Sequence, residues 1–477
     1  MTFQTNFPLY PTKLPYVTVS AKGMSNGLSD IPNDGFDFGP DTMLNTSSPD
    51  QYGPPYTQSM GLQEAWNYAL ANPINYSPAS SLYYVPEIHF VGGAYDIYAP
   101  VTINPPVYVH GETNVNGNNN YTIGNIIMKG QGSMNPYLIN HVTSDYMINV
   151  IPDNVINTNI QIDNLQLVSA IGTLAYGHIN LNFASNGKFI GANIFQSINL
   201  DVNLGTSQPP LNIIGVTSIL LWNYEMYGNQ SSTYPSSVFV ASIVFSAQSC
   251  NFNGEQIYAQ DLVNISGSLI NPAQSSEYGL IFPSGYNSNK PIAKVVISNS
   301  YISFPIQIGL QIDDFEISSS TLNWDSGTSY LLQAVSGTSP IIVKLRMKNN
   351  ALTGTGETTP AISTGITVYD YDLDEVTGNI GNYFPHDFSV NGTTSGQVLG
   401  HYVTYTANYK KLRLMFSAYE NDTTTNQTIN YPLPFSVIAV ITTNNTPLTL
   451  STSNTGLTIT TPNNTNTYFG LVIIEGY

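Results

Sequence analysis

The chain has 477 residues, and only 9% of them are charged, against roughly 25% in an ordinary soluble domain. Its formal net charge of −18 argues against a nucleic-acid partner, which requires clustered Lys and Arg. The single cysteine, Cys250, excludes an intrachain disulfide framework, and no run of about 20 apolar residues is present to span a membrane.

The polar surface must consist of hydroxyl and amide groups, because Tyr alone (33 residues) outnumbers Lys and Arg together (12). A hydrophobic fraction of 42% is sufficient for a packed core, so a disordered chain is not expected. Stability depends on pH through groups whose pKa changes on folding. Since few ionisable groups are present, we expect the fold to tolerate acid.

The N-terminal segment, residues 1–55, is rich in Pro, Gly, Asn and Asp. Pro8, Pro11 and Pro15 favour an extended backbone, so the segment is either a loose terminus or an arm that attaches to a larger particle. The first eight residues lack the basic and apolar regions of a secretory signal, and we expect none. Asn-x-Ser/Thr acceptor sequences nevertheless recur along the chain, as in exterior proteins.

One amphipathic helix is predicted near residues 61–72. Apolar residues recur there with helical spacing and form one stripe: Leu62, Ala65, Trp66, Ala69 and Leu70. Ser59 is the expected N-cap, and Asn72 followed by Pro73 should end the helix.

Short β runs follow the helix, including 88–90, 94–97, 101–103 and 107–109. Together with Asn33-Asp34-Gly35 upstream, this order resembles the beginning of pectate-lyase-like right-handed parallel β-helices, a family that includes many phage tailspikes. The resemblance implies that the helix caps the open end of the coil. Such a cap is needed because an open end exposes apolar rungs and unpaired strand edges.

The middle of the chain repeats a pattern of two alternating apolar residues, then Asn or Asp, then a third apolar residue. The turn residues of the five matches are Asn164, Asn223, Asn299, Asp314 and Asn349. Asn and Asp tolerate left-handed φ, so these positions predict stacked turns whose side chains form an amide ladder. A β-sandwich would also give alternation, but the recurring turn residue favours a parallel β-helix over residues 56–385, with loops of unequal length.

Three acids lie close together in the run Asp313, Asp314 and Glu316. Strand alternation predicts that Asp314 and Glu316 share a face with Ile312, while Asp313 points the other way. Paired acids perform acid–base chemistry in glycoside hydrolysis, so these three are catalytic candidates. The alternative is a turn aspartate with solvated acids, and no stronger catalytic motif is present.

Asp370, Asp372 and Asp374 alternate along a predicted strand and so share one face. Their mutual repulsion would be relieved by a bound Ca²⁺, which makes them metal-site candidates. The alternative is a solvent-facing acidic strip at the end of the coil.

Aromatic residues flanked by amides and acids are candidates for glycan binding, because Trp and Tyr are enriched at binding hot spots. Two groups meet this description: Trp222, Tyr224 and Tyr227, and Asn323, Trp324, Asp325 and Tyr330. The alternative is ordinary packing in a Tyr-rich protein.

Residues 386–477 contain short apolar runs separated by Asn and Thr clusters, which predict an antiparallel β-sandwich. The local strand signals are 412–416, 428–431, 435–441, 448–451 and 457–460, and a further run, 469–477, ends the sequence. The pattern Tyr409-Lys410-Lys411-Leu412, Tyr419-Glu420-Asn421 and Gln427 to Phe435 resembles the C-terminal domain of viral tail fibres and spikes. In that family the domain lies at the tip and contacts the host.

These resemblances imply an all-β virion protein, a tail fibre or spike that attaches to a host surface glycan or glycoprotein. They also imply a homotrimer that contacts other virion proteins through residues 1–55. We expect assembly in the host cytoplasm and a place on the virion exterior, and the low charge suits a virus of acidophilic archaea. Two alternatives stay open: a polysaccharide depolymerase that cleaves what it binds, and a structural capsid-turret or S-layer-like protein.

Overall fold

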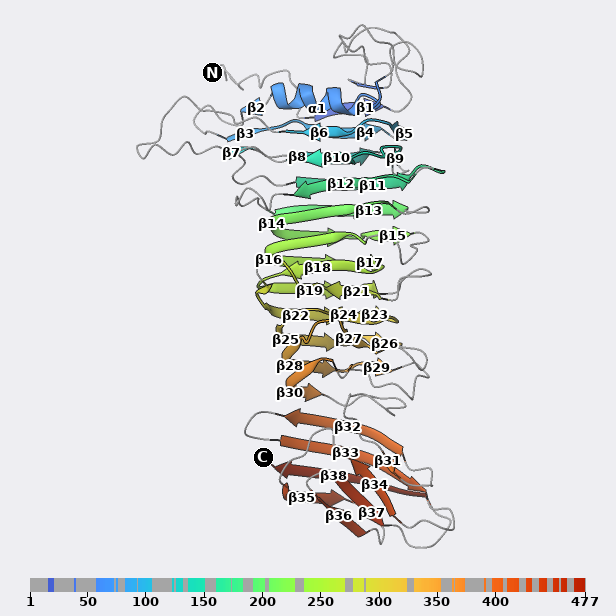
Figure 1. Cartoon of the computed structure of the whole chain (residues 1–477), viewed down its shortest axis with the longest axis vertical. Coiled ribbons are helices and arrows are strands. Elements are labelled where there is room, and N and C mark those ends of the chain that lie inside the picture. The colour runs from blue at the N-terminus through green and yellow to red at the C-terminus, as the bar shows by residue number, and fades with distance from the viewer. Residues whose placement is uncertain are drawn as a thin grey trace, which may run out of the picture. The chain divides into compact units, whose positions relative to one another are not determined.

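The computed structural model describes residues 16–20, 38–39, 57–72, 74–75, 82–91, 93–104, 122–123, 126–131, 136–150, 160–172, 174–182, 192–201, 206–227, 236–270, 278–286, 289–323, 330–352, 363, 365–373, 390–391, 397–405, 410–419, 426–430, 437–443, 449–453, 456–460 and 467–476. The chain forms two compact units that divide between Leu220 and Leu221. Within each unit, successive parallel strands stack as rungs (Figure 1).

Unit 1 contains one helix and a stack of parallel strands. Its elements are α1 (Leu62–Ala71), β1 (Tyr16–Ser20), β2 (Ile74–Asn75), β3 (Leu82–Tyr84), β4 (Glu87–Val91), β5 (Ala94–Ile97), β6 (Val101–Ile103), β7 (Thr122–Ile123), β8 (Ile126–Gln131), β9 (Tyr137–Asn140), β10 (Tyr146–Val150), β11 (Ile160–Ser169), β12 (Gly177–Asn182), β13 (Ala192–Asp201) and most of β14 (Leu211–Trp222). One parallel series runs β1–β4–β8–β11–β13, and another runs β6–β10–β12–β14. Inward residues in register, such as Ile88, Met128 and Ile162, are fully buried.

Unit 2 also contains a stack of parallel strands. They are β15 (Glu225–Tyr227), β16 (Val238–Gln248), β17 (Asn251–Phe252), β18 (Glu255–Ala259), β19 (Leu262–Ser266), β20 (Leu269–Ile270), β21 (Leu280–Phe282), β22 (Ile292–Ser298), β23 (Tyr301–Ile302), β24 (Ile306–Ile308), β25 (Ile312–Ser318), β26 (Thr321–Leu322), β27 (Leu332–Ala334), β28 (Ile341–Lys348), β29 (Ala351–Leu352) and β30 (Thr367–Leu373). The parallel pairs form three series: β16–β18–β21–β24–β27, β16–β19–β22–β25–β28–β30 and β15–β17–β20–β23–β26–β29. This stacking confirms the predicted all-β parallel β-helix, and crossovers between parallel strands are right-handed in nearly all proteins.

Antiparallel strands complete unit 2. They are β31 (Val390–Asn391), β32 (Gln397–Tyr405), β33 (Lys410–Tyr419), β34 (Asn426–Asn430), β35 (Val437–Thr443), β36 (Thr449–Thr452), β37 (Gly456–Thr460) and β38 (Thr467–Gly476). One antiparallel series, β32–β33–β38–β35, begins beside β30, and β31–β34–β37–β36 is a separate sheet. The predicted strands of this region are therefore present. Their assembly into a tail-fibre-type sandwich stays a prediction.

The helix confirms the predicted apolar stripe, because its five buried residues are those of that stripe. Its N-cap is Gly61, with φ of 83°, rather than the predicted Ser59. The Ser59 hydroxyl instead accepts from the backbone N–H of Gln63, at 3.2 Å, one turn into the helix. The side chain of Gln63 also bonds both backbone groups of Thr102 on β6, at 2.6 and 2.9 Å. The helix thus satisfies backbone groups at the edge of β6, which is part of what an end cap must do.

Six consecutive rungs of unit 2 place a left-handed residue at the same turn, with φ between 49° and 56°: Asn223, Ser249, Gly267, Asn299, Ser319 and Asn349. Asn164 in unit 1 also has positive φ, so four of the five predicted turn residues are confirmed. The fifth, Asp314, is wrong because it lies within β25 and Ser319 takes the turn.

The predicted amide ladder does not form along this turn column, because Ser and Gly interrupt the asparagines. From Ser268 onward, the next residue of each rung forms a buried ladder instead, in which a side-chain oxygen accepts from the backbone N–H of the preceding rung. Ser300 accepts from Ser268 at 3.1 Å, Ser320 accepts from Ser300 at 3.1 Å, and Asn350 accepts from Ser320 at 3.0 Å. Buried backbone donors are thereby satisfied where the coil turns.

The predicted domain limits, 55/56 and 385/386, stay predictions. Five residues of the expected N-terminal arm, Tyr16–Ser20, pair in parallel with β4, and most of that arm lies outside the described residues. No helix in the described part of the chain has the length and apolarity that a bilayer crossing requires.

Candidate functional site

The predicted catalytic acids lie on the outer face of the coil in unit 2. Asp314 and Glu316 both contact Arg346 of the next rung, at 3.1 and 3.8 Å, and their side chains are 23% and 20% exposed. Asp313 accepts a hydrogen bond from Gln311 at 2.7 Å. Ile312 is fully buried, so the prediction that it shares their face is wrong. Ile312 and Phe315 both point inward at a spacing of three, which interrupts the expected alternation.

Of the predicted metal-site residues, Asp370 is described with its side chain, and it follows Lys344 in register on the next rung. Asp370 and Asp372 of β30 stand opposite Lys344 and Arg346 of β28. The side chain of Asp372 and all of Asp374 lie outside the described residues, and the parts of the chain that are described contain no group of three metal-binding side chains. Binding of Ca²⁺ therefore stays a prediction.

This outer face of the coil, which we call the charged face of unit 2, alternates in sign from rung to rung. Lys294, Asp314, Lys344 and Asp370 follow one another in register. Opposite charges on neighbouring strands stabilise a sheet by roughly 0.2–1 kcal/mol per pair. Asp314, Glu316 and Asp370 each have a basic neighbour on the adjoining rung, so these acids belong to a charge ladder between rungs.

In the first group of glycan candidates, one described aromatic ring is exposed and the other is buried inside the β-helix. Trp222 is 46% exposed at the end of β14, whereas Tyr224 is 1% exposed. Burial makes the ring of Tyr224 unavailable to a ligand, which removes it from the predicted glycan surface. The side chain of Tyr227 lies outside the described residues.

The second group is partly described. Trp324 and Asp325 lie outside the described residues, and Tyr330 is half-buried. Asn323 donates a hydrogen bond of 2.7 Å from Nδ2 to the phenol oxygen of Tyr301, on the preceding rung. Sequence reasoning did not single out Tyr301, because nothing in the chain marks residues 22 apart as neighbours.

Tyr301 and Asn323 form what we call the Tyr301 platform. The ring of Tyr301 is 37% exposed, and its neighbours in register are Leu269 on one side and the small Thr321 on the other. The bond from Asn323 occupies the phenol oxygen as acceptor, so the phenol O–H can donate outward. The platform therefore presents an aromatic face beside the amide of Asn323 and the hydroxyl groups of Tyr301 and Thr321.

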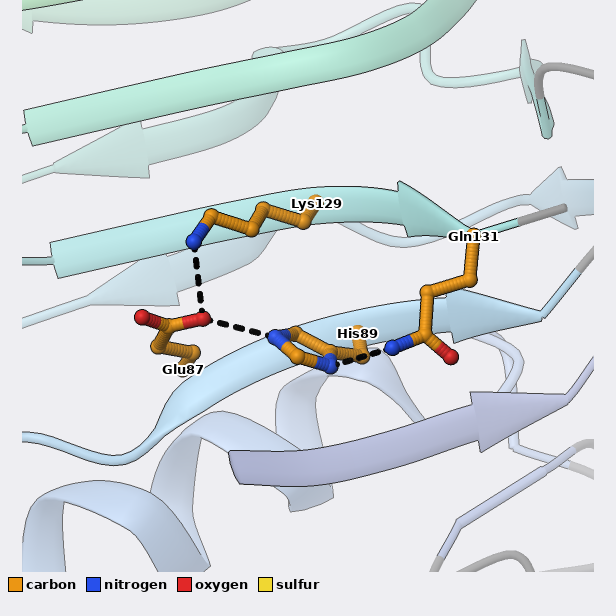
Figure 2. Close-up of polar contacts among 4 residues, drawn as sticks. All are labelled: Glu87, His89, Lys129 and Gln131. Carbon is orange, nitrogen blue, oxygen red and sulfur yellow. Dashed lines mark hydrogen bonds and ion pairs between the residues drawn. The ribbon is translucent and has the colours of Figure 1, made fainter. Parts of the chain in front are cut away.

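A polar cluster in unit 1 was not predicted. Glu87 and His89 project from β4, and Lys129 and Gln131 project from the adjacent β8 (Figure 2). Oε2 of Glu87 accepts from Nε2 of His89 at 2.7 Å and from Nζ of Lys129 at 3.0 Å. The amide of Gln131 donates to Nδ1 of His89 at 2.6 Å, which leaves the ring proton on Nε2. The ring of Tyr16 stacks on the imidazole with centroids 4.6 Å apart.

The surroundings of this cluster shift the pKa values of two carboxyl groups in opposite directions. Burial acts to raise the pKa of Glu87, but hydrogen bonds from His89 and Lys129 hold that pKa below its ordinary value. Asp163, in register with Lys129 on the following rung, has its pKa raised by burial, although Lys129 opposes the shift. One carboxylate is thus kept ionised while the other is biased toward its protonated form. The signal in the sequence was the outward spacing of Glu87 and His89 on one strand, but their partners lie 42 residues away.

No protein-family model matches the chain, and no curated protein matches it in sequence. Among solved structures, the Dettilon tailspike protein is similar over 87% of this chain and 90% of its own, with 8% identity and a TM-score of 0.32. The tailspike of the Acinetobacter baumannii bacteriophage Fri1, described as a capsular polysaccharide depolymerase, is similar over 88% and 82%, with 12% identity and a TM-score of 0.25. At these TM-scores the likeness assigns neither a function nor a site.

Proposed function

We propose that the protein is a virion tail fibre or spike that attaches to the host cell through a surface glycan. The observation that carries the proposal is the Tyr301 platform, an exposed aromatic ring held by an amide on the outside of a parallel β-helix. The homotrimer, the attachment of residues 1–55 to other virion proteins and the exterior location belong to the same proposal.

The chemistry of the platform suits a neutral sugar. The apolar face of a sugar ring packs on an aromatic ring, and the polar end of that ring forms hydrogen bonds with ligand hydroxyls. Leu269, Tyr301, Thr321 and Ala351 follow one another in register without a charge. A sugar with free hydroxyls can be bound there without burying an ion, and burial of an unpaired ion is costly.

The test is to screen the full chain against an array of neutral and acidic glycans and to titrate the strongest ligand. We expect Tyr301→Ala to lower the affinity for that glycan about tenfold, the equivalent of roughly 1.4 kcal/mol. Asn323→Ala should lower it less, because it leaves the ring in place. Tyr369→Ala is the matched control, since Tyr369 is also exposed in unit 2, at 56%, but lies on β30. An array without any binder, or equal affinity of wild type and Tyr301→Ala, would contradict the proposal.

A polysaccharide depolymerase is the second candidate, favoured by the cluster of Glu87, His89, Lys129 and Asp163. Carboxyl groups whose environments push their pKa values apart can serve as base and acid in one reaction. Burial and hydrogen bonding provide that separation for Asp163 and Glu87. Glycoside hydrolysis needs such a pair on either side of the scissile bond.

Incubation with host surface polysaccharide should then release fragments. New reducing ends would indicate hydrolysis, and ultraviolet absorbance of an unsaturated product would indicate elimination. Glu87→Gln and Asp163→Asn should each lower the rate by about a hundredfold, whereas Asp313→Asn should not. Loss of activity in Asp314→Asn instead would place the chemistry on the charged face of unit 2. Glycan binding without any release would leave attachment as the function.

A further inference from the structure

A carboxyl group occupies a core position of the coil in unit 2. Glu255, the first residue of β18, is in register with Leu280, and the following rungs place Ile306 and Leu332 in the same column. All four side chains are fully buried. Aliphatic side chains fill the column below Glu255, so packing alone gives no reason for an acid at its start.

The carboxyl lies inside a small set of buried donors. The phenol of Tyr224 donates to Oε1 at 3.0 Å and lies 3.5 Å from the hydroxyl of Ser237. Oε2 accepts from the backbone N–H of Asn253. Tyr224, Ser237 and Asn253 are all 0–1% exposed. Three segments of the chain therefore meet at one acid.

No cation compensates this acid among its contacts in the described residues. The titratable groups that face it are Tyr224, which precedes β15, and Cys250, which precedes β17. Burial raises the pKa of Glu255 to about 7, although hydrogen bonds from Asn253 and Tyr224 favour the ionised form. The group thus changes charge near neutrality, in a place where an unpaired charge is costly.

We propose that Glu255 is a proton-dependent latch: when its carboxyl is protonated, Oε1 donates to the phenol of Tyr224, which in turn donates to Ser237, and ionisation of the carboxyl loosens the start of β18. Above neutral pH the anion is better solvated when this rung opens to water. Below neutral pH the rung closes on a neutral group.

The direction of the effect follows from linkage. Because the folded pKa lies above the ordinary value of 4.5, the closed rung binds a proton that the open rung releases between these two values. Closure is therefore favoured in acid and weakened as the pH rises toward 7. Between pH 5.5 and pH 8.5 the opening equilibrium should rise roughly thirtyfold.

Amide hydrogen exchange of the full chain measures this opening locally. The informative amides are Gly254, bonded to the carbonyl of Gly279, and Gln256, bonded to that of Ser237. After correction for the intrinsic exchange rate, their opening should increase roughly thirtyfold between pH 5.5 and pH 8.5. In Glu255→Gln, which keeps the size and cannot ionise, it should stay constant.

Glu255→Leu provides a second variant, matched to the leucines of the same column, should the Gln variant fail to fold. Infrared spectra of the wild type supply an independent readout: a protonated carboxyl band at pH 5.5 that is lost at pH 8.5 and absent from the Leu variant. The latch would be overturned if the opening equilibrium depended on pH equally in wild type and Glu255→Gln. It would also be overturned if the protonated carboxyl band persisted unchanged in Glu255→Leu. Tyr301→Ala should leave both readouts unaltered, so failure of the glycan proposal does not affect this one.

Discussion

At the scale of single residues, burial decides the behaviour of ionisable groups more than their number does. His178 of β12 is fully buried, with Nδ1 3.3 Å from the amide nitrogen of Asn140. Its Nε2 is buried without a hydrogen-bond partner in the described structure. Burial lowers the pKa of His178 to about 3. This single ring opposes the acid tolerance that the low charge predicts.

The expected result is that unit 1 loses stability in acid. The folded state keeps His178 neutral, whereas the unfolded chain binds a proton below the ordinary pKa of 6.5. The loss therefore begins near pH 6.5, grows as the pH falls toward 3, and should reach roughly 3 kcal/mol at pH 4. Urea unfolding of wild type and His178→Phe at pH 7 and pH 4 measures it. The Phe variant should lose much less stability on acidification, and equal losses would show that His178 is not the cause.

At the scale of elements, the turn column of unit 2 shows how the coil is built. Its rungs differ in length, because the left-handed residues lie 18 to 32 positions apart, yet each turn has the same φ. The chain uses Asn, Ser or Gly there, the residues that tolerate left-handed backbone or form local hydrogen bonds. The conformation of the turn therefore stays constant while the rungs vary in length.

Asn299 tests this account of the turns. Its φ of 50° disfavours β-branched side chains, so Asn299→Val should destabilise unit 2 by about 1–2 kcal/mol. Asn299→Gly is the matched control and should cost less, because Gly adopts this conformation freely. The midpoint of urea unfolding gives both values. A Val variant as stable as the Gly variant would show that the conformation is not what selects the residue.

At the scale of the whole molecule, each unit contains a buried group that makes its stability depend on pH, and the two dependences have opposite directions. Unit 1 holds His178, whose burial favours neutral pH, and unit 2 holds Glu255, whose burial favours acid. Acid tolerance consequently stays a prediction, since it depends on the balance of these terms rather than on charge density.

The sequence by itself determined the class of fold and its local parts. Apolar alternation, the stripe of α1 and the turn asparagines each have a local physical cause, and all three are present, although the alternation is interrupted in β25. The charged face could be predicted only in part. Its acids were visible as neighbours in sequence, whereas Lys344 and Arg346 became their partners through rung register.

The tertiary structure decided which side chains meet. The link between Glu87 and Lys129 spans 42 residues, and that between Tyr224 and Glu255 spans 31. Such distances are set by loop lengths that carry no periodic signal. The sequence likewise did not determine which aromatic side chains are buried. Tyr224 and Trp222 lie two residues apart, yet Tyr224 is buried and Trp222 is exposed. A local pattern fixes how a strand alternates, while only the stacking of rungs fixes what lies beside it.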